Sequence, residues 1–307
     1  MTRRTTDVDE AARCLVGGGV VAFPTETVYG LGALAHREAA VRRVFAIKGR
    51  PGDHPLIVHL ASAGQLPAWA SEVPPSASAL AGALWPGPLT VLVRRAAHVP
   101  DVVTGGRPTV GLRVPAHPMA LALLAVVGDG VAAPSANRFG RVSPTSADHV
   151  LADLGDDVDL VLDGGPCALG VESTIVDCTQ EPPALLRPGG VPVEQLDAVL
   201  GRPVRRHDVG TSRAPGMLPS HYAPSCAVVL ASDGADAARR ADEARLAGRR
   251  VGVHDPGADV GAYARDLYAA LRRADEAGLE VLVVVPPPEA GLGAAVVDRL
   301  RRAAHRE

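Results

Sequence analysis

The chain has 307 residues, of which 47% are hydrophobic and 21% are charged, and its formal net charge is -3. This balance is typical of a globular protein and excludes a wholly disordered chain. The longest apolar run, Met119–Val127, is too short to span a bilayer, and the polar N-terminus lacks a signal-peptide core, so we expect a soluble, cytoplasmic protein that does not contact a membrane.

Strand-like apolar runs alternate with amphipathic segments over the first two thirds of the chain, which indicates an α/β domain. Strands are predicted at residues 20–23, 56–59, 90–93, 110–114, 130–133, 160–163 and 173–177. Helices are predicted at residues 8–16, 37–47, 77–84, 118–126 and 146–154.

The periodicity disappears between Arg202 and Pro224, where proline, glycine and polar residues dominate. Beyond this stretch, predicted strands alternate with predicted helices again, at residues 227–230, 235–246, 250–254, 262–277, 279–285 and 294–302. The sequence therefore predicts a large α/β domain over residues 1–201, a linker over 202–225 and a small doubly wound α/β domain over 226–307.

Two side-chain types occur only once in the chain. Lys48 is the single lysine among 31 Lys and Arg residues, and Asn137 is the single asparagine. An arginine-biased composition could leave one lysine and one asparagine by chance, but both residues fall in segments that have other features of a binding site. The four cysteines have no paired spacing, so we expect buried thiols and neither a zinc site nor a disulfide framework.

Lys48 and Arg50 follow the predicted helix at 37–47, with Gly49 between them. A compact ammonium group beside a planar guanidinium suits the phosphates of a nucleotide. Cations at the end of a helix also complement the helix dipole without any ligand. The residues alone leave both interpretations open.

Polar side chains follow several predicted strands, where α/β folds commonly build ligand sites. The segment 23–32 places threonines and glycines after one strand, although a plain turn with a buried Tyr29 has the same pattern. His59 ends another strand, where a lone histidine is more often structural. Arg113 lies within an apolar strand, so its buried guanidinium needs a partner, which is either a substrate carboxylate or an internal Asp or Glu.

Hydroxyl and amide side chains also cluster at residues 133–137 and 143–145. Together with backbone N–H groups at a helix start they suit phosphate oxygens, and the same hydroxyls also suit helix capping. The sequence contains no Walker-type phosphate loop, complete dinucleotide-binding glycine motif, nucleophile elbow or zinc helix. An enzyme with this sequence that used ATP would therefore have a less common fold.

Six segments in chain order resemble the YrdC-like domain of the Sua5/YrdC family, over roughly Val8 to Val199. They are PTETVYGLG (24–32), KGRPGDHPLIVH (48–59), GLRVP (111–115), SANRFGRVSPTSADHV (135–150), GVESTIVD (170–177) and RPGG (187–190). Later segments at 214–217, 221–224 and 291–304 resemble the linker and C-terminal domain of the longer, two-domain Sua5 form.

The resemblance implies a twisted, mixed α/β sheet with a large concave cavity, followed by a small Rossmann-like domain. It also implies a nucleotidyltransferase that converts L-threonine, bicarbonate and ATP into threonylcarbamoyl-AMP and pyrophosphate. A separate tRNA threonylcarbamoyl transferase would then pass the threonylcarbamoyl group to adenosine 37 of tRNAs that read codons beginning with A. Mg²⁺ is expected with ATP, bound through phosphate oxygens and water and not by metal ligands of the chain.

The resemblance also assigns roles to individual residues. Lys48 and Arg50 would be catalytic. Threonine would be held by Thr27, His59, Arg113, the backbone of Ala133, and Ser173. ATP would be bound by Lys48, Arg50, His54, Thr109, Ser135, Asn137, Ser143, Arg187 and Tyr222, the last as part of a lid.

Two other functions are compatible with parts of the sequence. The fold analogy also fits a module that binds double-stranded RNA, but the net charge of -3 and the lack of a basic run argue against it and give direct tRNA binding little support. YrdC-like domains also occur in carbamoyltransferases, but those proteins carry further domains, some with cysteine spacings that this sequence lacks. Dependence of the activity on free threonine would distinguish a threonylcarbamoyl-AMP-forming enzyme from a carbamoyltransferase.

Overall fold

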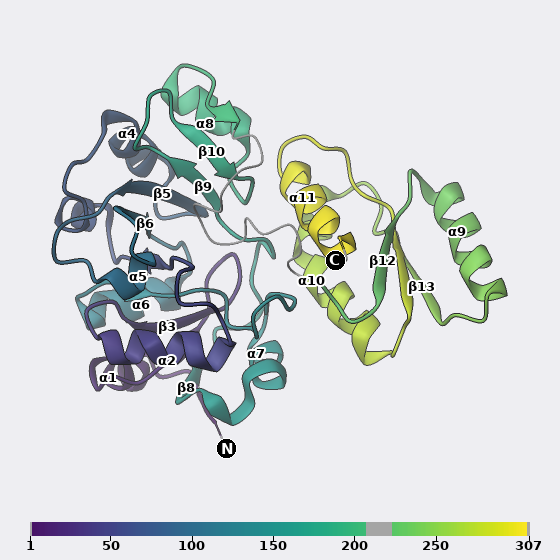
Figure 1. The fold of residues 1–307 in the computed structure, drawn as a ribbon, viewed down its shortest axis with the longest axis horizontal. Helices are drawn as coiled ribbons and strands as arrows, with labels where there is room; N and C mark the ends of the chain where they lie inside the picture. Colours follow the sequence, from purple (N-terminus) through teal and green to yellow (C-terminus); the bar gives the residue numbers. More distant parts are fainter. Residues whose placement is uncertain (1, 207–222, 306–307) are drawn as a thin grey trace.

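The computed structural model describes residues 2–206 and 223–305, and these residues form two separate β-sheets (Figure 1). The larger sheet has eleven described strands in the order β1-β8-β2-β3-β7-β4-β6-β5-β9-β10-β11, and its pairings are partly parallel and partly antiparallel. The strands are β1 (Arg3–Thr5), β2 (Val21–Phe23), β3 (Gly30–Leu34), β4 (Ile57–His59), β5 (Leu89–Arg94), β6 (Thr109–Arg113), β7 (Val131–Ala132), β8 (Leu160–Leu162), β9 (Thr174–Asp177), β10 (Ala184–Arg187) and β11 (Arg205–Arg206).

Helices cover both faces of this sheet. They are α1 (Val8–Val16), α2 (Glu38–Lys48), α3 (Leu66–Trp69), α4 (Pro75–Leu84), α5 (Asp101–Thr104), α6 (Pro118–Val127), α7 (Ala147–Leu154) and α8 (Val193–Leu200), with short 3₁₀ turns at Ala63–Gln65 and Gly155–Asp157. Side chains alternate along a strand, so Val21 and Phe23 of β2 pack in one apolar cluster with α1 and α6, and Ala22 packs in another with α2 and α4.

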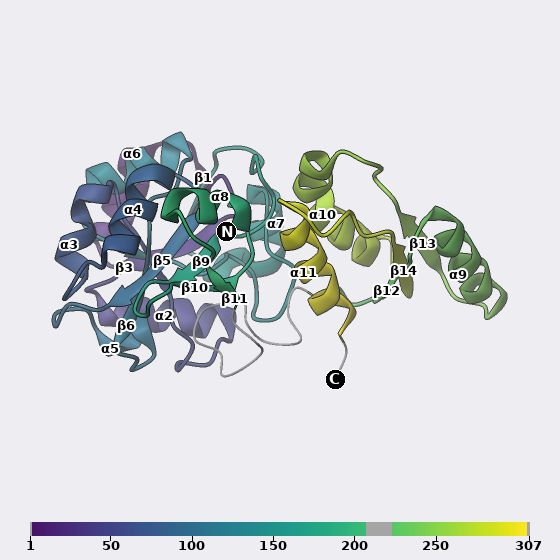
Figure 2. The ribbon, with the colours of Figure 1, turned by 90° about the horizontal axis from the view of Figure 1, so that it is seen from above.

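The smaller sheet is parallel, with the order β12-β14-β13. Its elements are β12 (Ala227–Leu230), α9 (Gly234–Leu246), β13 (Val251–His254), α10 (Val260–Glu276), β14 (Val281–Val284) and α11 (Gly293–Ala304). Helices α10 and α11 lie between this sheet and the large unit, and α9 lies at the far end (Figures 1 and 2). In the described residues no helix is both long and apolar enough to cross a membrane.

The two units share one apolar cluster. Val28, Val142 and Val171 of the large unit pack in it against residues of α10 and α11, among them Leu267 and Leu300. The backbones of the two units approach each other closely at Gly170, whose φ is +82° and where an added Cβ would lie 2.3 Å from the carbonyl oxygen of Ala264. Only glycine fits this position, because both the left-handed backbone and the approach of α10 exclude a side chain.

A Gly170→Ala substitution is expected to lower the free energy of unfolding by roughly 3 kcal/mol, because backbone strain and overpacking at the contact with α10 add together. Gly257 is the matched control, since its φ is +80° and an added Cβ would meet nothing within 4 Å. Gly257→Ala should cost about 1 kcal/mol, from the backbone conformation alone. Urea unfolding of the two variants measures the difference, and equal losses would contradict the packing argument.

The mixed α/β fold with a second, small parallel sheet confirms the predicted fold class, and every predicted strand and helix is present within a few residues of its expected bounds. Four strands were not predicted. β1 and β11 are short and polar, β3 contains two glycines, and the segment of β10 has the pattern of a turn with a cation. β11 lies within the expected linker and pairs with β10 in the large sheet.

Candidate active site

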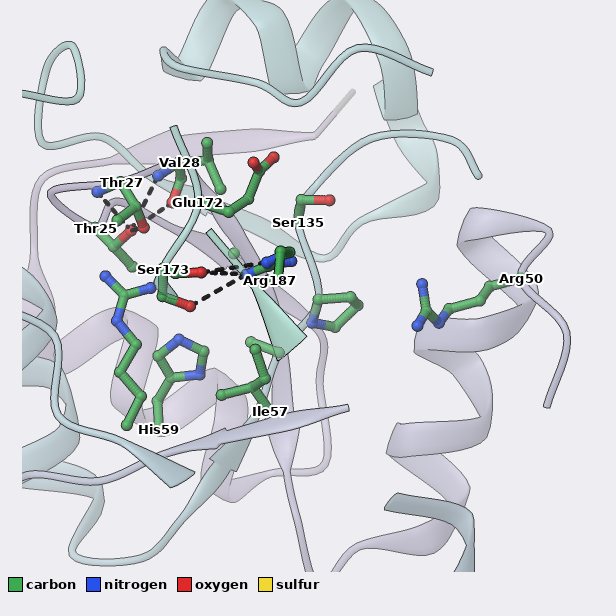
Figure 3. Close-up of a pocket in the computed structure, with 14 residues that line it drawn as sticks. Thr25, Thr27, Val28, Arg50, Ile57, His59, Ser135, Glu172, Ser173 and Arg187 are labelled. Atoms are coloured by element: carbon green, nitrogen blue, oxygen red, sulfur yellow. Dashed lines mark hydrogen bonds between the residues drawn. The ribbon is translucent and has the colours of Figure 1, made fainter. Parts of the chain in front are cut away.

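A cavity lies where several strands of the large sheet end (Figure 3), with about 570 Å³ of empty space that includes part of the open solvent at its mouth. Strand register sets its floor, because His59 of β4 is the direct partner of Arg113 of β6, and Val58 pairs with Ala132 of β7. The cavity is lined by Thr25, Thr27, Val28, Gly30, Arg50, Ile57, His59, Arg113, Ala133, Pro134, Ser135, Glu172, Ser173 and Arg187. All five residues expected to hold threonine are among them.

Two threonine hydroxyls form one wall of the cavity. The Thr25 Oγ1 lies 2.8 Å from Oγ1 of Thr27, donates to the carbonyl of Val28 at 2.6 Å and accepts from the N–H groups of Thr27 and Val28. Thr25 thus fixes the turn after β2 and orients the Thr27 hydroxyl, which lines the cavity. Tyr29 is fully buried beside this turn, as the structural interpretation of the segment also expected.

Arg113 has an internal partner. Its Nη2 lies 2.7 Å from Oε1 of Glu26 in a buried ion pair, and its Nε donates to the carbonyl of Gly87. The ion pair lacks hydrogen-bond alignment, and among the described residues neither Nη2 nor Oε1 has a hydrogen-bond partner. The structure therefore contains the internal carboxylate partner that the sequence left as one of two possibilities for Arg113. Among the described residues, the Nη2 of this cavity-lining guanidinium still has no hydrogen-bond acceptor.

His59 is buried and uncharged. Burial, and then the neighbouring Arg113 guanidinium, lower the pKa of His59 from 6.5 to about 3. Its ring packs edge-on against Phe23, and among the described residues its Nδ1 has no hydrogen-bond partner although it is buried. A buried polar atom without a partner costs free energy, so this nitrogen is suited to meet a polar group of a ligand.

Acid is expected to destabilise the protein through His59. The folded pKa lies below the unfolded value, so the contribution is fully present above about pH 6.5 and is lost as the pH falls toward 3, because only the unfolded state takes up the proton there. Going from about pH 7 to about pH 5 should cost roughly 2 kcal/mol at this site. Chemical unfolding of the wild type and of His59→Asn at both pH values measures the loss, and the same loss in the variant would contradict the assignment to His59.

Ser173 and Arg187 contact each other beside the paired strands β9 and β10. Arg187 Nε and Nη2 donate to the carbonyl of Ser173 at 3.2 and 2.8 Å, and Nη2 also reaches its Oγ. The Ser173 hydroxyl lies 2.8 Å from that of Thr90 on β5. Both side chains are buried and line the cavity, so they form a prearranged polar unit.

The residues expected to bind ATP divide into two groups. Arg50, Ser135 and Arg187 line the cavity, and Arg50 lies on the opposite side of the view from Thr25, Thr27 and His59 (Figure 3). The other described members are outside the lining: Lys48, His54, Thr109, Asn137 and Ser143. Tyr222 lies outside the described residues.

Lys48 is the last residue of α2, and Gly49, which adopts a left-handed φ of 62°, ends the helix. The Lys48 ammonium is buried and donates to the carbonyls of Ser135, at 2.6 Å, and of Asn137. Burial, and then the charge of Arg50, hold the pKa of Lys48 well below its usual value. The contacts of Lys48 therefore fix the loop that carries Ser135.

The remaining described members of this set have structural contacts elsewhere in the large unit. The Asn137 amide donates to the carbonyls of Arg138 and Arg141 at 2.8 Å, which closes the turn over residues 137–141. His54 packs against Phe139, and burial followed by the charge of Arg50 lowers its pKa. Ser143 donates to Glu172 at 2.7 Å, and Thr109 begins β6 opposite Arg94.

Sequence reasoning gave no role to Thr25, Glu26 or Glu172. Each belongs to one of the six segments that resemble the family. The sequence gives little indication of what the two carboxylates do, because their partners lie far away in the chain. Glu26 pairs with Arg113, and Glu172 contacts the C-terminal unit. The one available signal was the charge of a carboxylate beside a buried strand, where it needs a cationic partner.

The fold and the cavity define a two-unit α/β protein with a cavity lined by arginine, histidine and hydroxyl side chains. A family model described as telomere recombination, covering the Sua5, YciO and YrdC proteins, matches residues 13–189. A second model, described as the C-terminal domain of threonylcarbamoyl-AMP synthase, matches residues 191–305. The chain belongs to the Sua5/YrdC family, in its two-domain form.

Curated relatives named threonylcarbamoyl-AMP synthase include proteins of Pyrococcus abyssi and Bacillus subtilis. The Pyrococcus abyssi protein is 45% identical over 315 residues, which cover 95% of this chain and 92% of that protein. The Bacillus subtilis protein is 40% identical over 325 residues, which cover 97% and 92%. A solved structure of P. abyssi Sua5 complexed with L-threonine matches with a TM-score of 0.93 at 42% identity, and covers 99% of this chain and 97% of that one.

Proposed function

We propose that this chain is a threonylcarbamoyl-AMP synthase, which makes threonylcarbamoyl-AMP and pyrophosphate from L-threonine, bicarbonate and ATP. The observation that carries the proposal is that Thr27, His59, Arg113, Ala133 and Ser173 all line one cavity. The likeness to P. abyssi Sua5 complexed with L-threonine, over nearly the whole chain, supports it.

The reaction needs orientation and charge neutralisation more than it needs an enzyme nucleophile. The threonine amine attacks the carbon of bicarbonate, water leaves, and a carbamate oxygen then attacks the α-phosphorus of ATP with loss of pyrophosphate. In our proposal Arg113 pairs with the threonine carboxylate, and Thr27, His59 and Ser173 fix the amino acid. Arg50 and Arg187 then face the phosphates from the rest of the cavity.

Mg²⁺ is proposed to enter with ATP. Glu172, the carboxylate that lines the cavity, is held by an arginine, a tyrosine and a serine of the chain. In the described part of the chain no group of three or more His, Cys, Asp or Glu side chains is arranged to hold a metal. Such a site fits an ion bound by phosphate oxygens and water, which would lower the charge of the triphosphate.

The product is an activated acyl donor, so we propose that it passes to a separate tRNA threonylcarbamoyl transferase in the cytoplasm. The net charge of -3 gives no general attraction for the tRNA phosphate backbone, so the chain need not bind tRNA itself.

The decisive experiment is pyrophosphate release by the purified chain in the presence of ATP and Mg²⁺, with and without L-threonine and bicarbonate. Release that requires both, with threonylcarbamoyl-AMP identified by mass spectrometry, is the expected result. Turnover of carbamoyl phosphate without threonine would favour the carbamoyltransferase alternative, and no release under any condition would contradict the proposal.

A further inference from the structure

We propose that Arg299 and Tyr268 of the C-terminal unit are positioning residues for the active site and act on it through Glu172. The inference rests on the function proposed above, because it concerns the same cavity. It means that the C-terminal unit sets the geometry of two cavity-lining groups, Ser173 and Arg187.

Glu172 is where the two units meet at the cavity. It lines the cavity and is 6% exposed. Its carboxylate accepts from the Arg299 Nε at 2.6 Å and from the Tyr268 hydroxyl at 2.9 and 2.8 Å, both in the C-terminal unit. From its own unit it accepts from the Ser143 hydroxyl at 2.7 Å.

These contacts keep the buried carboxylate charged. Burial by itself would raise the pKa of Glu172, but the charges of Arg299 and Arg187, with the hydrogen bonds from Arg299 and Ser143, lower it to about 2. Arg299 is fully buried and also ion-pairs with Asp298. Because a buried charge that loses its partner is costly, the arrangement around Glu172 should be held tightly while Arg299 is present.

Backbone contacts connect Arg299 and Glu172 to the cavity-lining residues Ser173 and Arg187. Arg299 Nη2 donates to the carbonyl of Pro188, which directly follows Arg187. The Gly190 N–H donates to the carbonyl of Glu172, and an added Cβ at Gly189 would lie 2.3 Å from the carbonyl carbon of Ser173. Residues 187–190 therefore pack directly against residues 172–174. Arg299 contacts both segments, through Glu172 and through the carbonyl of Pro188.

If Arg299 and Tyr268 only stabilised the interface between the units, their substitution would lower stability without affecting the active site. Arg272 of α10 also crosses the interface, where its Nη2 lies 2.7 Å from Oδ2 of Asp153. Asp153 does not line the cavity. Asp153→Asn is therefore a matched control, which weakens an ion pair between the units without touching the groups that hold Glu172.

The experiment compares Arg299→Gln, Tyr268→Phe and Asp153→Asn in the full chain, by steady-state pyrophosphate release, calorimetric binding of L-threonine and thermal unfolding. Arg299→Gln is expected to raise the KM for threonine or ATP by about tenfold or more, and Tyr268→Phe by roughly threefold, with Asp153→Asn unchanged. The double variant Glu172→Gln/Arg299→Gln should recover part of the loss, because the amide removes the unpaired charge.

The proposal is overturned if the variants lower only the melting temperature and leave KM, kcat and threonine binding as in Asp153→Asn. If Arg299→Gln does not fold, Tyr268→Phe decides, since it removes a single hydroxyl. Hydrogen exchange at the amides of residues 173–174 and 189–190 separates this inference from the proposed function. Faster exchange in Arg299→Gln but not in Asp153→Asn supports positioning even if the wild type releases no pyrophosphate, and unchanged exchange contradicts it.

Discussion

Replacing Arg113 with glutamine is expected to lower kcat/KM for L-threonine by about 10²–10³-fold, because in the proposed function this buried guanidinium pairs with the substrate carboxylate in a charge-assisted contact of several kcal/mol. The loss should appear mainly in KM, since the contact is made to the bound substrate throughout the reaction. Pyrophosphate release at varied threonine concentration, with ATP saturating, measures it.

The internal partner Glu26 requires a control, because Arg113→Gln also leaves that carboxylate buried without its cation. The double variant Glu26→Gln/Arg113→Gln removes this charge and should recover most of the lost thermal stability. Its threonine-dependent activity should stay low. Recovery of activity in the double variant would mean that Arg113 only balances Glu26, and would remove it from the threonine site.

Lys48→Ala is expected to lower the free energy of unfolding by roughly 4 kcal/mol, because it removes the ammonium donor from the carbonyls of Ser135 and Asn137 and opens a cavity beneath their loop. Activity should fall as well, since Ser135 lines the cavity of the proposed reaction. Denaturant unfolding and pyrophosphate release on the same preparations give both numbers.

Arg50→Met is the comparison for this prediction, because Arg50 lines the cavity directly and Lys48 does not. We expect Arg50→Met to reduce activity at a smaller cost in stability. A Lys48→Ala protein that unfolds like the wild type and is nevertheless inactive would show that the ammonium acts on the ligand itself, and would support its assignment as a catalytic residue.

Apolar patterning was sufficient for most of the fold, because β4, β6 and β9 are runs of largely buried residues. The same signal could not find β3, in which glycines replace side chains. An added Cβ at Gly32 would lie 2.7 Å from the ring of Phe23, so close packing onto β2 requires glycine at this position. Glycine is also the residue that makes the segment look unlike a strand in the sequence. β1 and β11 lack an apolar run altogether and are defined by pairing at the edges of the sheet.

The site was less accessible from the sequence than the fold. A strand end drew attention to His59, and a charge within an apolar strand drew attention to Arg113. The roles of these residues came from the family resemblance, and their chemistry left the partner of Arg113 undecided. That partner, Glu26, is fixed by tertiary packing. The single lysine drew attention to Lys48, but local reasoning could not tell that its acceptors are the backbone carbonyls of Ser135 and Asn137.

The direct pairing of His59 with Arg113, and of Val58 with Ala132, limits how the length of this chain can vary. Side chains alternate between the faces of a sheet, so one inserted or deleted residue in β4, β6 or β7 would turn a cavity-lining side chain into the opposite layer. Substitution there changes one contact, whereas a shift in register displaces several at once. In a library of single-residue insertions and deletions, these three strands should therefore tolerate far less than the surface turns that join them.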